Sequence, residues 1–290
     1  MINIFILNWK SAGDVRECLN SIVASDEKDY RILLINNYSD NQDLEDVRAL
    51  YDFYRASSDI YLVENSSNYG YAGGNNAGLN FLKSKNLDGD ILILNPDIII
   101  SENTLSEMKH ALTEDIGIVT VRTVNPSGKI LFDSIKIHGF RQIKKITNKK
   151  YVLTDYSQGS CMLIARQIIN TIGLFDERFF LYWEEVDFSL RVRSLGKKLI
   201  SVTSTIIIRK DNNQGRKPEV FYYSVRNARL VREKHPDFFS VNSYRLYLVR
   251  IILLIFGYIL KPKLCIRLMC CYFTALYDSK NNIYFRKLKM

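Results

Sequence analysis

The chain has 290 residues, enough to bury a large hydrophobic core in one or two domains. Hydrophobic residues make up 47% and charged residues 24%, with only five prolines, which excludes a largely disordered chain. The formal net charge is +9, and the basic excess falls in residues 136–150 and in the C-terminal third. The first of these stretches contains Lys136, Arg141, Lys144, Lys145, Lys149 and Lys150. This distribution favours contact with phosphate or an anionic membrane surface; a basic face that only aids solubility is the alternative.

The cysteines and the first residues bear on the compartment. The five cysteines, at positions 18, 161, 265, 270 and 271, show no CxxC pair or other metal-ligand spacing. We therefore expect no disulfide framework and a reducing cytosol. The first nine residues contain an apolar run without a basic segment or a small-residue cleavage site, so we expect a first strand rather than a signal peptide.

Apolar runs of strand length alternate with helix-period segments through the first 120 residues. We expect strands at 2–8, 32–35, 60–63, 91–94 and 116–121, and helices at 13–24, 41–55, 74–85 and 101–113. The runs are rich in Ile, Leu and Val without polar alternation, which predicts a mostly parallel sheet with helices on both faces. This order is that of a Rossmann-like, doubly wound α/β fold, which binds ligands beyond the carboxyl ends of its strands.

The second half is less regular. Residues 122–158 show a turn at 125–128 but no clear element. We expect a strand at 159–165, helices at 167–172 and 183–195, and short strands at 198–202 and 205–208. Gly196 is expected to end the second of these helices. From about 217 onward the pattern is helical.

The C-terminal segment is apolar and basic. The run 244–260 is short, and Arg250 interrupts it, so it falls below the length that spans a bilayer. Lys261, Lys263 and Arg267 follow, and then apolar and aromatic residues continue to Tyr277. We expect two interfacial helices on an anionic leaflet; a buried helical hairpin or an interface in a homo-oligomer is the alternative.

A glycine- and asparagine-rich segment, NYGYAGGNNAG, follows the third predicted strand at 68–78. Gly70, Gly73 and Gly74 would let the backbone approach a ligand, and the amides of Asn75 and Asn76 lie near the start of a helix. The segment favours a diphosphate site, although such turns are also common for structural reasons.

Asn95, Pro96 and Asp97 follow the fourth predicted strand. Pro96 fixes the chain after a buried strand, so Asp97 is presented at the sheet edge. A single carboxylate there suits Mg²⁺ or Mn²⁺ shared with phosphate oxygens. The alternative is a turn that only precedes the next helix.

Three acids, Glu184, Glu185 and Asp187, begin the helix at 183–195. Carboxylates in a first turn stabilise the helix dipole, which is the structural interpretation. Several aromatic residues crowd the same segment, however, and an apolar environment raises a carboxyl pKa toward the range of a general base. An inverting sugar transfer needs one such base to take the proton from the acceptor hydroxyl.

Together these motifs resemble inverting glycosyltransferase family 2, which has the GT-A fold, and within it the bacterial rhamnosyltransferase-like branch. The motifs are Asn8-Trp9, the segment 68–76, Leu94 to Asp97, Gly173 to Glu177, Phe180 to Asp187 and on to Arg191, and Tyr222-Tyr223 with Arg226-Asn227. The resemblance covers about residues 1–235, which we expect to form the GT-A domain, with 236–290 as a C-terminal helical, membrane-associated extension.

The resemblance implies roles for individual residues. The donor-binding set is Asn8, Asn36, Asn68, Gly70, Gly74, Asn75, Asn95, Asp97 and Arg209. Asp97 matches the metal-linked final acid of the family's DXD-type motif and would hold Mg²⁺ or Mn²⁺. Glu185 matches the usual general base, flanked by Glu184 and Asp187.

Three positions depart from the family. Asn36 stands where an Asp commonly holds the nucleoside, and Glu185 is one methylene longer than the usual Asp. Arg209 stands about where related enzymes place a His that can ligate the metal. Because arginine cannot ligate a metal but can grip a diphosphate, we expect weakened metal dependence, with Arg209 and Lys210 stabilising the leaving group. The alternative is that Arg209 points to solvent in a rearranged loop.

The sequence thus predicts an inverting glycosyltransferase that moves a sugar from a nucleotide-diphosphate donor to a lipid-linked or growing glycan acceptor at the cytoplasmic membrane face. One alternative is a catalytically weak binding or scaffold homologue, which the three departures favour. Another is a sugar nucleotidyltransferase, although residues 8–13 lack the glycine-rich basic loop expected of one. Nucleic-acid binding is disfavoured because the basic residues follow no recognisable reading element.

Overall fold

The structure is a computed structural model that describes residues 1–210 and 218–284. The strands are β1 (Ile2–Asn8), β2 (Tyr30–Asn36), β3 (Ile60–Glu64), β4 (Asp90–Leu94), β5 (Ile98–Ile100), β6 (Ile116–Val124), β7 (Ile130–Phe132), β8 (Ser134–His138), β9 (Arg141–Lys145), β10 (Tyr151–Leu153), β11 (Cys161–Ile164) and β12 (Lys198–Arg209). The helices are α1 (Ala12–Val23), α2 (Asn41–Tyr54), α3 (Gly70–Ser84), α4 (Thr104–Ala111), α5 (Arg166–Ile172), α6 (Glu184–Ser194), α7 (Pro218–Lys234), α8 (Val241–Phe256) and α9 (Pro262–Lys280), with a 3-10 turn η1 (Glu177–Phe179).

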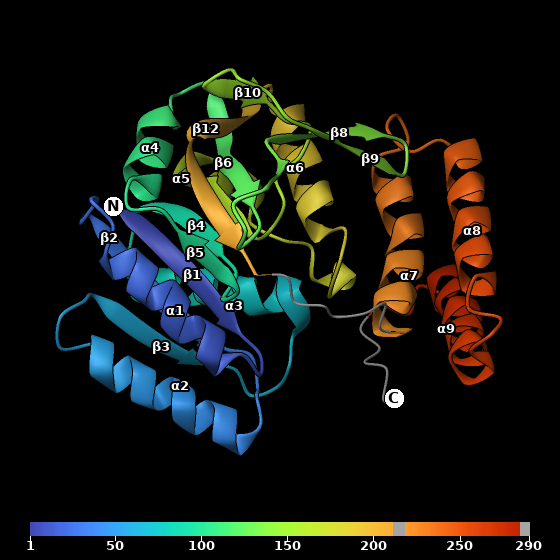
Figure 1. Cartoon of the computed structure of the whole chain (residues 1–290), viewed down its shortest axis with the longest axis horizontal. Helices are drawn as coiled ribbons and strands as arrows, with labels where there is room; N and C mark the ends of the chain where they lie inside the picture. Colours follow the sequence, from blue (N-terminus) through green and yellow to red (C-terminus); the bar gives the residue numbers. More distant parts are fainter. Residues whose placement is uncertain (211–217, 285–290) are drawn as a thin grey trace.

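A mostly parallel sheet forms the centre, with helices on both faces (Figure 1). The strand order is β10-β12-β6-β11-β4-β1-β2-β3, with β5 beside β12 and β7 beside β6. β1 pairs in parallel with both β2 and β4, whereas β11 is antiparallel to its neighbours β4 and β6. This arrangement confirms the predicted α/β architecture.

The apolar residues of the sheet are buried on both faces. One core cluster packs α1, α2 and α4 against the sheet, and a second packs α3, α5 and α6 against the opposite face. The central strand β1 contributes to both clusters, Ile4 to the first and Phe5 to the second, because successive side chains of a strand point to opposite faces. Continuous Ile-, Leu- and Val-rich runs are therefore required here, as in other covered parallel sheets.

Several predicted elements were wrong in detail. The region 122–158 forms β7 to β10, including the two-stranded β8–β9 hairpin, where the sequence predicted irregular structure. β12 is one bent strand rather than two short ones, with a register shift between Val202 and Ile206. The strand β5 was not predicted. The predicted helical pattern from 217 begins, in the described residues, with α7 at Pro218.

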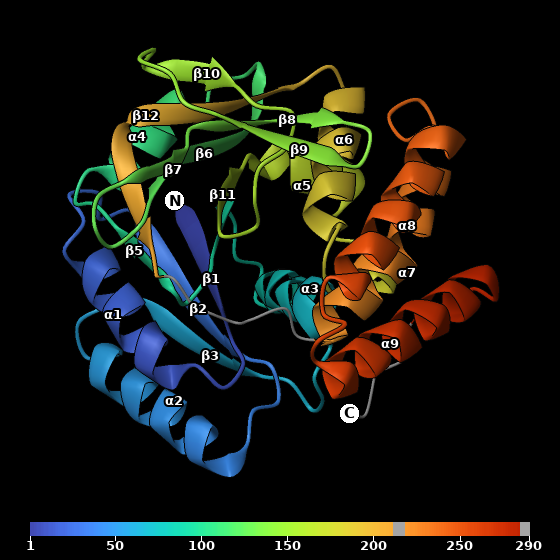
Figure 2. The ribbon, with the colours of Figure 1, turned by 45° about the vertical axis from the view of Figure 1, so that its right-hand side comes forward.

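The helices α7, α8 and α9 form a layer beside the sheet, as Figures 1 and 2 show. Buried residues of α7, among them Tyr222 and Val225, pack with Ile255 of α8 and Leu268 of α9. The Tyr222 hydroxyl donates to Asp278 Oδ2 over 2.6 Å. None of the helices in the described ranges is both long and apolar enough to cross a membrane.

Candidate functional site

The predicted site residues lie where the connection order of the sheet reverses. β1 continues to β2 on one side, while β4 lies on its other side, and doubly wound sheets bind ligands outside the strand ends at such a point. Asn8 and Asn36 are register partners at the ends of β1 and β2. Asn95 directly follows β4, and its Oδ1 accepts a hydrogen bond from the Tyr71 hydroxyl over 3.1 Å.

Asn8 and Asn36 belong to a buried polar network. Asn8 Nδ2 donates to Asn36 Oδ1 over 3.2 Å and to Asp43 Oδ2 over 2.6 Å. Asp43 Oδ1 in turn accepts from the backbone N–H of Ala12 over 2.9 Å. These side chains hold the starts of α1 and α2 against the strand ends, so any contact they make with a nucleoside is in addition to these bonds.

An open hollow of about 620 Å³ lies at the starts of α1 and α2, next to this network. Lys10, Asp14 and Asp40 are among the residues that line it. Two exposed aromatic residues, Trp9 and Tyr38, follow β1 and β2. Tyr38 was not predicted as a site residue, and its position directly after a parallel strand was the available signal.

The glycine-rich segment is a helix rather than an open loop. α3 begins at Gly70, four residues before its predicted start. Gly70 has a φ of +71°, and a Cβ there would overlap the backbone oxygen of Phe180. A Cβ on Gly74 would lie 2.6 Å from Leu7 Cδ1. The Phe180 oxygen accepts from the N–H of Tyr71 over 2.6 Å, so these glycines serve close packing within the protein.

Asparagine side chains fix the approach to α3. Asn37 Nδ2 donates to Asn68 Oδ1 over 3.1 Å and to the Gly70 oxygen over 3.0 Å. Asn68 Oδ1 also accepts from the Gly70 N–H over 2.8 Å. Asn75 is fully buried and donates to the Tyr71 oxygen over 2.9 Å, while its Oδ1 has no partner among the described residues. Asn37 is therefore a structural determinant that was not among the predicted site residues.

Asp97 and Arg209 are brought together by the pairing of β5 with β12. Arg209 lies opposite Ile98 in the strand pairing. The backbone N–H of Lys210 donates to the backbone carbonyl oxygen of Asp97 over 3.2 Å. Burial raises the pKa of the Asp97 carboxyl, and the charges of Arg209 and Lys210 oppose this rise. The predicted carboxylate and the predicted arginine thus occupy one corner of the site.

The two basic residues of this corner differ in what they contact. Arg209 is partly buried, and its Nη1 donates to Gln158 Oε1 over 3.1 Å. Lys210 Nζ instead forms ion pairs with Asp14 at 2.9 Å and Glu17 at 2.7 Å. Arg209 is thus directed into the site, whereas the ammonium of Lys210 is engaged by α1. The following segment, 211–217, on which the predicted loop falls, lies outside the described residues.

Glu184 and Glu185 form the first turn of α6, and both lie in a desolvated environment. Burial raises the pKa of Glu185 to about 7, against the opposing effect of backbone N–H groups at its own position and at Trp183. Burial, followed by the charge of Glu185, raises the pKa of Glu184 well above its usual value. Both Oε2 atoms are buried without a hydrogen-bond partner among the described residues. The neutral form of Glu184 is therefore favoured, while Glu185 is suited to exchange a proton near neutral pH.

Two tyrosines, the partly buried Tyr71 and the fully buried Tyr156, lie between these acids and the Asp97 corner. Burial raises the pKa of Tyr71 well above its usual value, and the charges of Glu185 and Asp97 both contribute. Burial and the charge of Glu185 raise the pKa of Tyr156, while the charge of Arg209 opposes this rise. The charges of Glu185 and Asp97 both act on Tyr71, and those of Glu185 and Arg209 both act on Tyr156, so the sheet edge and the start of α6 lie near one another. The sequence reasoning missed both tyrosines.

Asp187 lies apart from this arrangement. Its fully buried carboxylate contacts Arg191 at 2.9 Å, Lys234 at 2.9 Å and His235 at 2.8 Å. Burial opposes its ionisation, but the hydrogen bond with His235 and the charges of Arg191 and Lys234 hold its pKa below the usual value. This geometry makes Asp187 an ion-paired link between α6 and α7, while its predicted catalytic role stays a prediction.

The basic β8–β9 hairpin reaches from the sheet toward α6 and α8 (Figure 2). Phe140 at its tip stacks on Tyr247 of α8, with ring centres 4.9 Å apart. Lys144 Nζ lies 5.0 Å from the centre of the Phe132 ring. Burial and the charge of Arg209 lower the pKa of Lys144, so this lysine of the basic stretch is near the site.

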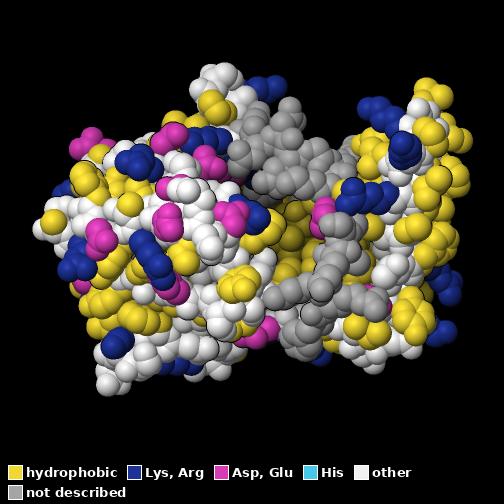
Figure 3. All heavy atoms as spheres, turned by 90° about the horizontal axis from the view of Figure 1, so that it is seen from below, with side chains coloured by type: hydrophobic (Ala, Val, Ile, Leu, Met, Phe, Trp, Pro, Cys, Tyr) yellow, Lys and Arg dark blue, Asp and Glu magenta, His cyan; other side chains and the backbone are white. Residues whose placement is uncertain are grey.

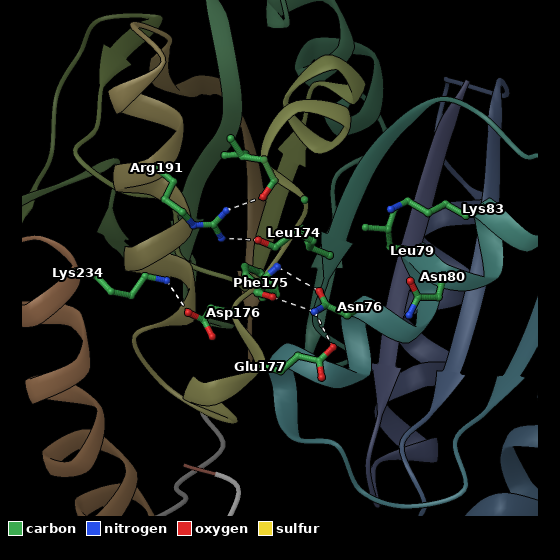
Figure 4. A pocket seen from close by; sticks show the side chains of 12 residues that line it. Asn76, Leu79, Asn80, Lys83, Leu174, Phe175, Asp176, Glu177, Arg191 and Lys234 are labelled. Atoms are coloured by element: carbon green, nitrogen blue, oxygen red, sulfur yellow. Dashed lines mark hydrogen bonds and ion pairs between the residues drawn. The ribbon is translucent and has the colours of Figure 1, made fainter. Parts of the chain in front are cut away.

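A second hollow, of about 420 Å³, lies beside α3 and the Gly173–Glu177 motif (Figure 4). Many of its polar groups already have partners. Asn76 contacts both Phe175 and Glu177, and Lys234 pairs with Asp176 at 2.6 Å. The motif therefore secures the loop before α6, and Figure 4 draws only Asn80 and Lys83, on the α3 side of the hollow, as polar side chains without a marked interaction.

Comparisons with known proteins are consistent with this geometry. A model of glycosyl transferase family 2 matches residues 4–173. The chain is 29% identical over 201 residues to the low-salt glycan biosynthesis hexosyltransferase Agl10 of Haloferax volcanii, a match covering 66% of this chain and 61% of that protein. It is 25% identical over 218 residues to the rhamnosyltransferase WbbL of Escherichia coli, covering 69% of this chain and 79% of that protein.

Solved structures share the fold. The mannosyltransferase PcManGT from Pyrobaculum calidifontis, in complex with GDP-Man and Mn²⁺, superimposes with a TM-score of 0.59 at 13% identity, covering 96% of this chain and 87% of that one. This likeness confirms the predicted GT-A fold. The chain spans only about three fifths of the length of the Haloferax relative.

We predict that Asp187→Asn lowers the free energy of unfolding by about 3 kcal/mol, because it leaves buried cationic groups without their counter-ion. Denaturant unfolding of the variant and the wild type measures this. The rate per folded molecule should fall much less than in a variant of Glu185. An unchanged stability with a 100-fold loss of rate would show instead that Asp187 takes part in the reaction.

Proposed function

Since this chain belongs to glycosyl transferase family 2, we propose that it is an inverting glycosyltransferase that uses a nucleotide-diphosphate sugar. Its acceptor is a lipid-linked or growing polysaccharide, reached at the cytoplasmic face of a membrane. The rhamnosyltransferase and hexosyltransferase relatives support a hexose or deoxyhexose as the transferred sugar. The family match gives no support to the nucleotidyltransferase alternative.

The observation that carries the proposal is that a candidate base, Glu185, lies near a candidate diphosphate-binding pair, Asp97 and Arg209. Glu185 is a buried carboxylate with a pKa of about 7 and an unpartnered oxygen, which suits a general base. Asp97 and Arg209 lie at the strand ends, where a phosphate-bearing ligand is expected. Tyr71 and Tyr156 are within electrostatic reach of both groups.

The chemistry of the transfer follows from these positions. Glu185 takes the proton from the acceptor hydroxyl while the oxygen of that hydroxyl attacks the anomeric carbon of the sugar. A new glycosidic C–O bond forms as the bond from that carbon to the diphosphate oxygen breaks. The nucleoside diphosphate leaves with the electron pair, and Arg209 stabilises its charge through a bidentate contact. The surrounding aromatic side chains exclude water, which keeps these electrostatic effects strong.

Asp97 is the residue that would hold Mg²⁺ or Mn²⁺. Within the described ranges there is no group of three or more His, Cys, Asp or Glu that could hold a metal. A buried single carboxylate still fits a cation that takes its other ligands from phosphate oxygens and water. Such a cation, when bound, supplies positive charge that neutralises the diphosphate. Arg209 would also supply positive charge to the diphosphate, so the cation and the guanidinium would stabilise the same leaving group.

The exposed side of α8 and α9 supports docking on an anionic membrane. Large apolar side chains recur there at helical spacing: Leu246, Val249, Leu253 and Leu260 in and after α8, and Ile266, Phe273 and Tyr277 on α9. Leu260 is 94% exposed. Figure 3 shows hydrophobic side chains gathered on this side of the molecule, with Lys and Arg among them. The basic residues Lys261 and Lys263 complement anionic headgroups.

We predict that Glu185→Gln lowers kcat by about 100- to 10,000-fold while donor binding is retained, because the amide keeps the shape but cannot take a proton. A thermal-shift panel of UDP-, dTDP- and GDP-sugars first identifies the donor, which both proteins should bind. Glu184→Gln is the matched control: since burial favours the neutral form of Glu184, this variant should lose far less activity. Equal rates for the wild type and Glu185→Gln would contradict the assignment, and a chain that binds donor without transferring sugar would fit a scaffold homologue.

The wild-type rate should also depend on pH. Glu185 acts as the carboxylate, so protonation below its pKa of about 7 should lower kcat, and the rate should rise as pH increases through that value. Kinetics between about pH 5 and pH 9 test this, with unfolding monitored across the same range. A rate that is flat across neutrality would exclude a base with this pKa.

We predict that chelation of divalent metal by EDTA lowers the wild-type rate by only about tenfold, because Arg209 still stabilises the leaving group. Arg209→Ala should lose a further 10- to 100-fold (roughly) and become strictly dependent on added Mg²⁺ or Mn²⁺. Lys210→Ala is the comparison, and its loss should be smaller because its ammonium is paired with α1. Complete metal dependence of the wild type, with full activity in Arg209→Ala, would contradict this account.

Flotation with liposomes tests the membrane proposal. The wild type should float with vesicles containing phosphatidylglycerol and much less with pure phosphatidylcholine vesicles, because the basic residues need an anionic surface. Leu253→Glu with Leu260→Glu should abolish flotation. Phe53→Glu, at a similarly exposed apolar residue on α2, is the control and should float normally. If the double variant instead floats normally but has a smaller oligomeric size in solution, the face is an interface between copies of the chain.

A further inference from the structure

The segment that leads into α6 has an unusual backbone. Phe180, Tyr182 and Trp183 have positive φ values of 61°, 68° and 76°. Residues with a Cβ rarely adopt this region, and such conformations persist only where surrounding contacts impose them. Because Glu184 and Glu185 follow directly, the contacts that impose this backbone also determine where the two acids lie.

Buried side chains of α7 supply many of these contacts. Asn227 is fully buried, and its Nδ2 faces the carbonyl oxygens of Phe179 at 2.7 Å, Leu181 at 2.8 Å and Tyr182 at 2.8 Å. Three acceptors therefore converge on one amide nitrogen. Without the two hydrogens of this amide, the carbonyl groups of Leu181 and Tyr182 would lose this donor, which is costly for groups away from water.

Arg226 completes the arrangement. It too is fully buried, and its Nη2 donates to the carbonyl oxygen of Phe179 over 2.7 Å. Its Nε donates to Asn227 Oδ1 over 2.9 Å, which orients the amide so that Nδ2 points at the segment. The guanidinium is thus used to hold backbone and to position its neighbour.

The segment is fixed from other sides as well. Trp183 Nε1 donates to the oxygen of Ser224 on α7 over 3.1 Å. The Phe180 oxygen accepts from the start of α3, and the Phe180 ring stacks on Tyr223 with centres 5.0 Å apart. Loss of the α7 donors would therefore release one side of a segment that remains attached on the other, which favours a local shift over unfolding.

We propose that Arg226 and Asn227 are positioning residues for the transfer reaction, which hold residues 179–183 so that Glu185 faces the acceptor from a water-excluded place. This inference rests on the proposed role of Glu185 as the base. It assigns to the Tyr222-Tyr223, Arg226-Asn227 motif a role in catalysis through the backbone, without contact to the substrate.

The test uses Asn227→Leu, which keeps the number and branching of the side-chain heavy atoms and removes the donor. If the segment relaxes, Glu185 becomes better hydrated, so the pH at which kcat is half-maximal should move down by about one unit or more, toward the usual value for glutamate. At a pH above neutrality kcat should fall about 10- to 100-fold from misplacement of the base, while the Kd for the nucleoside diphosphate that stabilises the wild type stays within about twofold.

Leu268→Ala is the control, because it removes buried packing between the C-terminal helices and leaves the hydrogen bonds of Arg226 and Asn227 to the segment in place. It should lower Tm without moving the pH profile. If Asn227→Leu does not fold, Trp183→Phe removes a single anchor of the same segment and should move the profile in the same direction by less. The proposal is overturned if these variants lose activity only in proportion to the fraction of protein that is unfolded and keep the wild-type pH profile.

Glu185→Gln, measured in the same assays, separates the two claims. An inactive Glu185→Gln beside an Asn227→Leu with the wild-type profile would overturn the positioning role alone. A fully active Glu185→Gln would overturn the proposed base, and with it the inference that depends on it.

Discussion

The contact between the start of α3 and the Phe180 carbonyl joins the two halves of the site. Tyr71 donates its N–H to this oxygen over 2.6 Å, and the absence of a side chain on Gly70 leaves room for the approach. On one side of the contact, Tyr71 reaches Asn95 at the sheet edge. On the other side, the chain continues through the strained segment to Glu185. A displacement of either partner would therefore separate the diphosphate corner from the base.

The acids of α6 show how neighbouring carboxylates obtain different properties from their surroundings. Glu184 and Glu185 are desolvated without counter-ions among the described residues, so their neutral forms are favoured. Asp187, two residues after Glu185, is fully buried but contacts Arg191 of α6, Lys234 of α7 and His235 directly after α7, so its charged form is favoured. One turn of helix thus carries both a candidate base and a structural anion. Sequence spacing alone does not distinguish them, because the partners come from other elements.

The extent to which the sequence predicted the structure follows from the range of the interactions involved. β1, β2, β4 and β6 were predicted because their apolar runs are local signals. The β8–β9 hairpin was missed because β9 is fully exposed and basic and because β8 offers only two isoleucines as an apolar signal. The start of α3 was misplaced because Gly70, Gly73 and Gly74 are read locally as a loop, whereas packing against Leu7 and Phe180 makes them helical. Asp97 and Glu185 were identified by motif, but Tyr71, Tyr156 and Asn227 acquire their roles only through contacts across the fold.

A crystal structure with a bound nucleoside diphosphate would test the central claim, that the Asp97–Arg209 corner and Glu185 form one donor site, most directly. The account predicts that the diphosphate lies between Asp97 and the Arg209 guanidinium, with its terminal phosphate directed toward Glu185 and the space between them bordered by Tyr71 and Tyr156. A diphosphate bound elsewhere, such as in the hollow beside the Gly173–Glu177 motif, with Glu185 remote from it, would contradict the account.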